Sequence, residues 1–410
     1  MILLEVLHWQ DAGNPCLSSL TGEYTVSNKR IMQATWVFGL MVSTACTPAV
    51  PSGAASPIFT DTAQITSNTT PETEITATLP AEKLPTATTT LFAEQVNTRP
   101  PGTLTATQVF PTITPIPPGQ RLWVKGSPLP TQRLELGSAE LNGTIYVAGG
   151  SHANGLTYAR MEVYDPLTDA WSIAAPIPIG RHHFGMAALD GKIYVSGGLP
   201  DWFRFTDTCF VYDPATDLWS EIAPLPYRLA THSMAALDGK LYVVGGADAP
   251  IGGGPMKMFV YDPATDTWDD SRAVMPTGRE HLAVVAAEGK LYALGGRIQQ
   301  SANLAIVEIY DPQTDTWTRA PDMPVAVSGF TAAYLNGRIH ATGGEDLFAM
   351  TVMNAHQVLD LATMTWEQWP ELPGARHGVT SQAVNGQWIV IGGSPRADMG
   401  MTGRVDIFTP

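Results

Sequence analysis

The sequence predicts an all-β fold, a six-bladed β-propeller, from three observations. Glycine pairs recur every 48 to 50 residues, at positions 149/150, 197/198, 245/246, 295/296, 343/344 and 392/393. Tryptophans recur every 48 or 49 residues, as Trp123, Trp171, Trp219, Trp268, Trp317 and Trp366. Each unit also contains four short segments of strand-like composition separated by turn residues. A repeat of this length with four strands is typical of a propeller blade, so six units predict six blades.

The third unit shows the four predicted strands in order. Residues 232–237 (HSMAAL) are mostly small or apolar, and Asp-Gly at 238–239 predicts a hairpin turn into the apolar run 240–244. The third strand ends at Pro263, because proline has no N–H to donate to a ladder. The fourth strand carries Trp268. The two glycines that follow each second strand permit a backbone path and a close approach that a Cβ would obstruct.

The order of these landmarks resembles the kelch repeat. A Gly-Gly pair is followed about fifteen residues later by Tyr-Asp-Pro, and a tryptophan stands seven residues after that tyrosine, as in YDPLTDAW, YDPATDLW, YDPATDTW and YDPQTDTW. The fifth unit departs from the pattern with LDLATMTW, and the sixth ends at VDIFTP without a tryptophan. The resemblance covers residues 120–410 and implies a kelch β-propeller. Landmarks that recur in every unit are expected to serve blade packing.

The missing sixth tryptophan is expected to come from the start of the folded region. Trp123 lies ahead of the first hairpin, as the later tryptophan strands lie ahead of theirs. We therefore expect this N-terminal strand to complete the last blade, begun by residues 376–408, and to close the ring without a free edge. The propeller is predicted to span residues 119–410.

Residues 1–46 are predicted to be a leader with an export signal. The basic residues Lys29 and Arg30 precede a short uncharged stretch, 31–45, which ends in three small residues before Cys46. This order resembles a bacterial lipoprotein signal, in which Cys46 would be lipidated, and ordinary secretion is the alternative. The long lead before the uncharged stretch suggests that the natural start lies further along the chain.

Residues 47–118 are predicted to be a disordered linker. They contain 19 threonines and 12 prolines but three aromatic residues, so they cannot bury enough apolar surface to offset the entropy of ordering. Signal and linker together predict a monomeric propeller in the bacterial cell envelope or at the extracellular surface, held to the membrane only by its N-terminal lipid.

Charge and cysteine content narrow the possible partners. The net charge of -15 argues against nucleic acid or an anionic membrane as the partner of the folded region.

Only one of the three cysteines, Cys209, lies in that region, so no disulfide is expected there. The sequence has no Cys-x-x-Cys or His-x-His pair, and the adjacent His182 and His183 would point to opposite faces of a strand. We therefore expect neither a metal nor another cofactor.

Candidate ligand contacts are expected on the face that carries the loops leading into each first strand, here named the lead-in face. The residues after each Gly-Gly pair reach the same face and differ among the units, and function is expected where blades differ. Sixteen residues before the first glycine of a pair stand Arg133, Arg181, Arg279 and Arg376. The candidate set also includes His183, His281, His377, Trp202, Arg297 and Glu345.

A ring of arginines in an acidic domain predicts an anionic ligand, either an acidic sugar or an acidic peptide segment of a protein partner. Guanidinium groups hold carboxylates through two parallel hydrogen bonds, which suits them to this task. The alternative interpretation is that these arginines bond the backbone carbonyls of the loops.

Three functional classes compete. Because no catalytic motif stands at a fixed spacing, the leading interpretation is a noncatalytic module that binds protein or carbohydrate. The alternative is a sugar-acid isomerase, since some secreted bacterial kelch proteins that this chain resembles are sialic-acid mutarotases. Proton transfer would then fall to Glu345, Glu280 or His281. A copper enzyme resembling galactose oxidase is disfavoured, because Cys209 lies in a predicted structural strand three residues before Tyr212.

Overall fold

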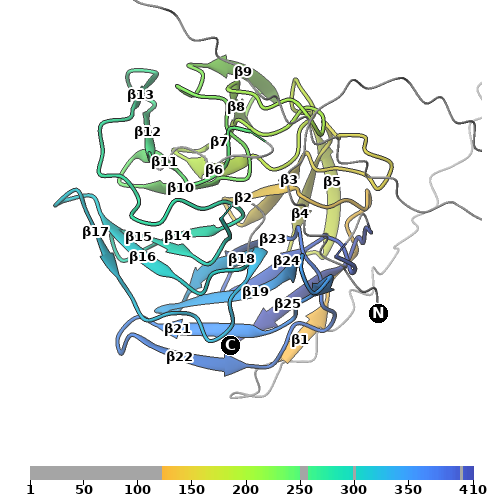
Figure 1. The fold of residues 1–410 in the computed structure, drawn as a ribbon. Helices are drawn as coiled ribbons and strands as arrows, with labels where there is room; N and C mark the ends of the chain where they lie inside the picture. Colours follow the sequence, from red (N-terminus) through yellow and green to blue (C-terminus); the bar gives the residue numbers. More distant parts are fainter. Residues whose placement is uncertain (1–121, 250–256, 299–301, 398–399) are drawn as a thin grey trace, which may run out of the picture. The chain divides into compact units, whose positions relative to one another are not determined.

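The computed structural model describes residues 122–249, 257–298, 302–397 and 400–410. The predicted leader, the linker and Cys46 lie outside these residues. Within them the chain forms strands joined by turns and contains no helix, hence no helical membrane span. The predicted fold class is confirmed, because six antiparallel sheets form the blades of a β-propeller (Figure 1).

Five blades take their strands in chain order, each strand antiparallel to the next. The first two comprise β2 (Gly137–Leu141), β3 (Thr144–Ala148), β4 (Met161–Asp165) and β5 (Ala170–Ala174), then β6 (Gly185–Leu189), β7 (Lys192–Ser196), β8 (Cys209–Asp213) and β9 (Leu218–Ile222). The third and fourth comprise β10 (Ser233–Leu237), β11 (Lys240–Val244), β12 (Phe259–Asp262) and β13 (Thr267–Asp269), then β14 (Ala283–Ala287), β15 (Lys290–Leu294), β16 (Val307–Asp311) and β17 (Thr316–Arg319). The fifth comprises β18 (Ser328–Leu335), β19 (Arg338–Asp346), β21 (His356–Asp360) and β22 (Thr365–Trp369), with the short β20 (Thr351–Val352) paired to β19.

The sixth sheet combines the two ends of the described chain. Its strands are β23 (Thr380–Val384), β24 (Gln387–Ile391), β25 (Val405–Thr409) and, on the outside, β1 (Leu122–Lys125). β1 runs antiparallel to β25, with Trp123 opposite Phe408. The first strands of neighbouring blades lie side by side around the axis, and β2 contacts both β6 and β23 (Figure 1).

Repeated tyrosine, aspartate and tryptophan side chains join neighbouring blades. The Tyr212 hydroxyl donates to Oδ1 of Asp217 at 2.6 Å, and the same oxygen accepts the N–H of Ala175 from the preceding blade at 2.8 Å. Nε1 of Trp219 donates to the Ala175 carbonyl at 2.9 Å. Trp123 of β1 makes the corresponding bond to a carbonyl of the blade before it, at 2.7 Å. The recurring residues therefore hold the blades to one another.

The paired glycines lie where one blade passes close to the next. Gly149 and Gly150 have φ angles of +61° and +97°, a region that favours glycine. A Cβ on Gly149 would lie 2.5 Å from the carbonyl oxygen of Arg181 in the next blade. Larger side chains fill the space elsewhere between blades, as where Tyr242 of the third blade packs in one apolar cluster with Tyr310 of the fourth.

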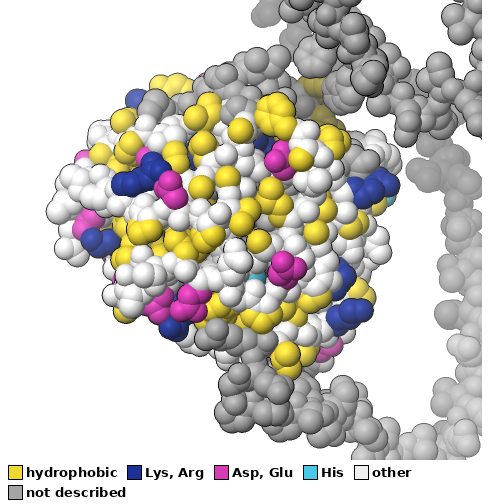
Figure 2. All heavy atoms as spheres, turned by 60° about the horizontal axis from the view of Figure 1, so that its bottom comes forward, with side chains coloured by type: hydrophobic (Ala, Val, Ile, Leu, Met, Phe, Trp, Pro, Cys, Tyr) yellow, Lys and Arg dark blue, Asp and Glu magenta, His cyan; other side chains and the backbone are white. Residues whose placement is uncertain are grey.

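The surface carries mixed side chains. On the face shown in Figure 2, lysine and arginine side chains lie in small groups among acidic and hydrophobic ones. Several loops after Gly-Gly pairs expose apolar side chains, including Phe203 at 79% and Phe348 at 71% exposure. These loops therefore offer apolar contact area on the lead-in face.

Candidate functional site at the mouth of the central channel

Six residues, one from each blade, form a closed ring of backbone hydrogen bonds at one end of the central channel. Each N–H donates to the carbonyl of the corresponding residue in the preceding blade, at 2.8 to 3.2 Å. The members, here named the axial ring, are Glu135, His183, Thr231, His281, Gly329 and Gly378. The bond from the Glu135 N–H to the Gly378 carbonyl closes the ring at 2.9 Å.

Every member of the axial ring has a positive φ, a conformation that costs a residue with a Cβ about 1–2 kcal/mol. Gly329 and Gly378 adopt +62° and +59°, which glycine tolerates. The other φ angles are +54° at Glu135, +55° at His183, +58° at Thr231 and +52° at His281. Two blades thus show that glycine fits this position, whereas four blades hold a strained side chain there. Positive φ also occurs at Asp217, which joins two blades, so the angle alone does not mark a functional site. At the axial ring it coincides with side chains that line one cavity.

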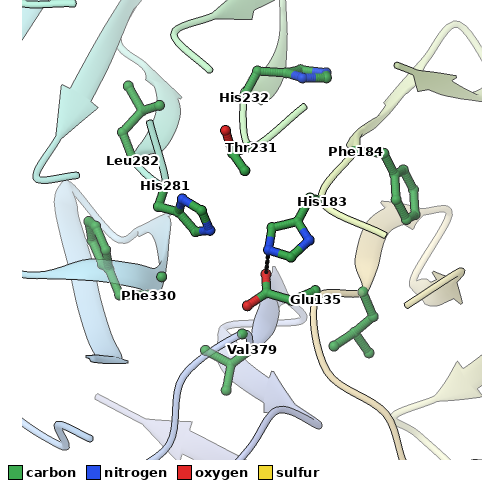
Figure 3. Close-up of a pocket in the computed structure, with 12 residues that line it drawn as sticks. Glu135, His183, Phe184, Thr231, His232, His281, Leu282, Phe330 and Val379 are labelled. Atoms are coloured by element: carbon green, nitrogen blue, oxygen red, sulfur yellow. Dashed lines mark ion pairs between the residues drawn. The ribbon is translucent and has the colours of Figure 1, made fainter. Parts of the chain in front are cut away.

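Three of these side chains face a common space at the axis (Figure 3). Nε2 of His183 lies 3.3 Å from Oε2 of Glu135. The ring centroids of His183 and His281 are 5.1 Å apart, with the rings almost perpendicular at 80°. One potential ligand atom from each of the three residues lies within 4.8 Å of the other two. Three blades therefore bring one carboxylate and two imidazoles together.

A second set of charged side chains surrounds the axial ring. Arg297 donates to Glu345 through Nη1 at 2.8 Å and to Glu280 through Nε at 3.1 Å. Its Nη2 lies 3.1 Å from Nδ1 of His281. Nδ1 of His377 lies 3.1 Å from Oε2 of Glu345. The guanidinium of Arg297 is therefore already engaged by two carboxylates of the same site.

Burial changes the protonation of the axial groups. It raises the pKa of Glu135 to about 7 and lowers the pKa of His183 well below its ordinary value, so that this imidazole is neutral at pH 7. Burial also acts to raise the pKa of Glu280, but the neighbouring His281 and Arg297 outweigh it and bring that pKa down to about 2. The site therefore holds an ionised Glu280 beside a Glu135 that is close to its titration midpoint at neutral pH.

The axial ring borders a cavity of about 90 Å³. This space admits a few water molecules or one polar group of a ligand rather than a whole sugar ring. Behind it the channel continues through a cavity of about 190 Å³ whose lining includes the hydroxyl side chains Ser138 and Thr380. A third cavity of about 310 Å³, lined largely by alanines, lies toward the turns between first and second strands.

The four predicted arginines lie inside their own blades and not at the mouth. Arg133, Arg181, Arg279 and Arg376 are each at most 3% exposed. Arg279 donates to the carbonyls of Gly295, Thr277 and Ala293 at 2.7 to 2.9 Å and pairs with the buried Glu308. Arg181 likewise donates to the Gly197 and Thr208 carbonyls at 2.7 and 2.9 Å. The expectation of a basic ring at the ligand site is therefore wrong. The arginines are structural, because each guanidinium donates to backbone carbonyls within its own blade.

The other predicted residues do gather near the axis. His183, His281, Arg297, Glu345 and His377 form one connected cluster with Glu135 and Glu280. The ring centroid of Trp202 lies 4.3 Å from that of His182 and 5.9 Å from that of His183. The expectation that His182 and His183 point to opposite faces is wrong, since their Nδ1 atoms are in contact. The positive φ at His183 interrupts the alternation of a strand.

Two members of the site, Glu135 and Thr231, were not predicted from the sequence. Both stand two residues after the arginine register, the same place that His183 and His281 occupy in their units. Comparing the units position by position would have revealed a column with glycine in two units and polar side chains in four. The strain at that column, however, appears only in the backbone angles.

Comparisons with known proteins support the same architecture. The family description "KLHDC2/KLHL20/DRC7 Kelch-repeats domain" matches residues 231–407, and "Kelch motif" matches residues 132–178 and 180–226. A solved structure titled "Structure of YjhT" is similar with a TM-score of 0.58 and 20% identity, over 69% of this chain and 96% of that chain. At this identity the similarity shows the fold alone. No curated protein matches the chain. The motif matches and the six four-stranded blades show that this chain belongs to the kelch-repeat family of β-propellers.

Proposed function

We propose that this kelch propeller is a noncatalytic binding module that holds a small polar ligand at the axial ring. The observation that carries the proposal is the strained backbone of Glu135, His183, Thr231 and His281, in a column where two other blades use glycine. Glycine occupies the same column in two blades, so the ring of backbone hydrogen bonds does not require a side chain there. The convergence of the four side chains on one cavity supports a binding role.

The chemistry of the mouth favours a ligand rich in hydroxyl groups, such as a sugar or a sugar acid. A carboxylate accepts hydrogen bonds, and a neutral imidazole both donates and accepts them. The cavity of about 90 Å³ admits one end of such a ligand. The remainder would lie against the loops of the lead-in face, where side chains such as Phe203 are exposed.

A second candidate function is isomerisation of a sugar or sugar acid. The specific observation in its favour is the distance of 3.3 Å between His183 and Glu135, a carboxylate and an imidazole at the same mouth. Ring opening and closure of a sugar need one group to remove a proton and another to supply one. This pair could share those tasks without any cofactor.

Calorimetry of the full chain with neutral sugars, sialic and uronic acids and acidic peptides tests the proposal, with EDTA present throughout. His281→Gly removes one axial side chain at a position where glycine is unstrained. We expect at least a tenfold loss of affinity without a lower melting temperature. Arg319→Ala is the control, because Arg319 is half exposed and forms an ion pair with the exposed Asp322. Affinity that is unchanged in His281→Gly, or binding of no compound by the wild type, would refute the site.

Proton NMR separates the two candidate functions. Accelerated exchange between the anomers of a bound sugar, lost in Glu135→Gln, would favour the isomerase. Binding with exchange at the solution rate would favour the noncatalytic module. Both experiments use the same sugars, so affinity and exchange are compared for one ligand.

We also propose that the protein is exported and anchored through Cys46. The support is the order of basic residues, uncharged stretch, small residues and cysteine, followed by the Thr/Pro-rich residues 47–118. A propeller held in this way would present its binding face outside the membrane.

A further inference from the structure

We propose that Glu135, His183 and His281 form a binding site for a divalent first-row transition metal, such as zinc, on the propeller axis. Their potential ligand atoms lie within 4.8 Å of one another and come from three different blades. Two imidazole nitrogens and one carboxylate oxygen are a donor set that zinc and related ions bind. The inference goes beyond the proposed binding function and does not depend on it.

The neighbouring contacts orient both imidazoles for this task. Nδ1 of His281 lies 3.4 Å from Oε2 of Glu280, and Nδ1 of His183 contacts Nδ1 of His182. Nε2 of His183 faces Glu135, whose Oε2 lies 3.3 Å away. Nε2 of His281 lies 3.2 Å from Nη2 of Arg297, a contact that a metal bound at this nitrogen would displace. A metal-bound histidine commonly engages its second nitrogen, here Nδ1, with a carboxylate or another polar partner.

The charge around the site suits a divalent cation. Three carboxylates, from Glu135, Glu280 and Glu345, lie within one network of contacts with the single guanidinium of Arg297. Glu135 must be deprotonated to bind a metal, and the three carboxylates and one guanidinium then have a formal charge of about -2 with the imidazoles neutral. Arg297 lies close to His281, but its charge is already offset by its ion pairs with Glu280 and Glu345. A divalent cation would therefore balance the remaining negative charge.

The backbone ring fixes the ligands before any metal binds. The three residues are linked through amide hydrogen bonds that run around the whole axis, from His183 to Glu135 at 3.2 Å and from His281 through Thr231 at 3.0 Å. Three protein ligands leave at least one coordination position of zinc free, as in catalytic zinc sites. The adjoining cavity of about 90 Å³ is the space from which a ligand group could take that position.

Titration of the full chain with zinc tests the proposal. The protein is stripped with a chelator, exchanged into buffer, and titrated with ZnCl₂ by calorimetry and with Co²⁺ by visible absorption. We expect one ion per chain and a Co²⁺ spectrum characteristic of nitrogen and oxygen ligands. His183→Gly, His281→Gly and Glu135→Gln should each weaken zinc binding at least tenfold. Glu280→Gln should weaken it about 10- to 100-fold by releasing His281 from its orientation.

The glycine variants keep the test decisive, because glycine already occupies this column at Gly329 and Gly378. They are expected to melt no lower than the wild type, so lost binding would not reflect lost folding. His152→Ala is the matched control: this histidine follows a Gly-Gly pair, bonds its own loop through Nδ1 and lies outside the ligand set. It should bind zinc like the wild type.

Several outcomes would overturn the proposal. These are the absence of stoichiometric uptake by the wild type, uptake that is unchanged in both glycine variants, and an equal loss in His152→Ala. The sugar calorimetry described above is performed in EDTA, so the two ideas can fail separately. Sugar binding in EDTA together with no zinc uptake would refute the metal site and leave the binding module intact.

Discussion

Nε2 of His183 lies 3.3 Å from Oε2 of Glu135, although the two residues stand 48 positions apart and belong to different blades. The separation equals one repeat, so a residue at the same place in each unit returns to the axis once per blade. Any side chain in this column meets its counterparts from the neighbouring blades. Three such counterparts make the proposed site.

Replacing Thr231 should expose the strain in the axial ring. Thr231→Gly is expected to be more stable than Thr231→Ala by about 1 kcal/mol, because only alanine keeps a Cβ at a φ of +58°. Both variants lose the hydroxyl group, so the difference between their unfolding free energies isolates the cost of a Cβ on the strained backbone. Urea unfolding measures it.

Thr318, an exposed residue of β17, serves as the control for Thr231. In an ordinary strand the order reverses, and Thr318→Ala should be more stable than Thr318→Gly by about 0.5–1 kcal/mol. Equal stability of Thr231→Gly and Thr231→Ala would contradict the strain argument.

Arg279→Met should destabilise the fold by about 3–5 kcal/mol, because it leaves the buried carboxylate of Glu308 without its partner. Arg279→Met combined with Glu308→Leu should recover much of that loss, and neither variant should alter ligand affinity at the mouth. Denaturant melts and calorimetry measure the two effects. If Arg279→Met had normal stability but bound the ligand more weakly, Arg279 would have to be a ligand contact.

Acid should destabilise the protein partly through His232. Nε2 of His232 accepts the Gly185 N–H at 3.1 Å, and burial lowers its pKa to about 3. The unfolded chain takes up a proton below about pH 6.5 whereas the folded chain does not, so stability falls as pH falls through this window. Between pH 7.5 and 4.5 the wild type should lose about 3 kcal/mol more than His232→Gln, which cannot titrate.

The comparison of His232→Gln with the wild type cancels the titration of groups that both proteins share. Unfolding free energies at the two pH values supply the test. A difference between the proteins that stays the same at both values would show that His232 does not have the lowered pKa.

Removing residues 1–118 should leave the melting temperature almost unchanged, whereas removing residues 1–126 should lower it. The longer deletion removes β1, leaves the edge of β25 unpaired and deletes Trp123, whose ring centroid lies 5.1 Å from that of Phe408. Thermal melts of both truncations, with Trp123→Leu in the full chain as a milder change, are the measurement. Equal melting temperatures would exclude a stabilising role for this strand.

Cys46 is predicted to carry the lipid anchor. Labelled palmitate supplied to a bacterial expression host should enter the wild type but not Cys46→Ser. Cys209→Ser should still be labelled, because Cys209 is buried in β8. Label in Cys46→Ser, or none in the wild type, would argue for ordinary secretion.

The sequence by itself determined the number of blades and the residues that join them. Its period, its glycine pairs and its tryptophans recur because each blade meets the same packing problem, and a solution repeated six times is visible in one dimension. The sequence also contains a pattern that indicates a structural role for its arginines. In three of the four units with such an arginine, the third strand carries an acid at one register, Glu162, Glu308 or Asp406. Their pairing with Arg133, Arg279 and Arg376 accounts for this pattern.

Only the tertiary structure decided where function is expected. Glu135 and His281 are separated by 146 residues of chain (281 − 135), and they share the axis because the ring brings each unit back to one centre. The four arginines are likewise buried only in the folded blades, where each donates to backbone carbonyls of its own blade. Positive φ at a glutamate, a threonine and two histidines runs against local preference. It is imposed by six hydrogen bonds that exist only once all the blades have met.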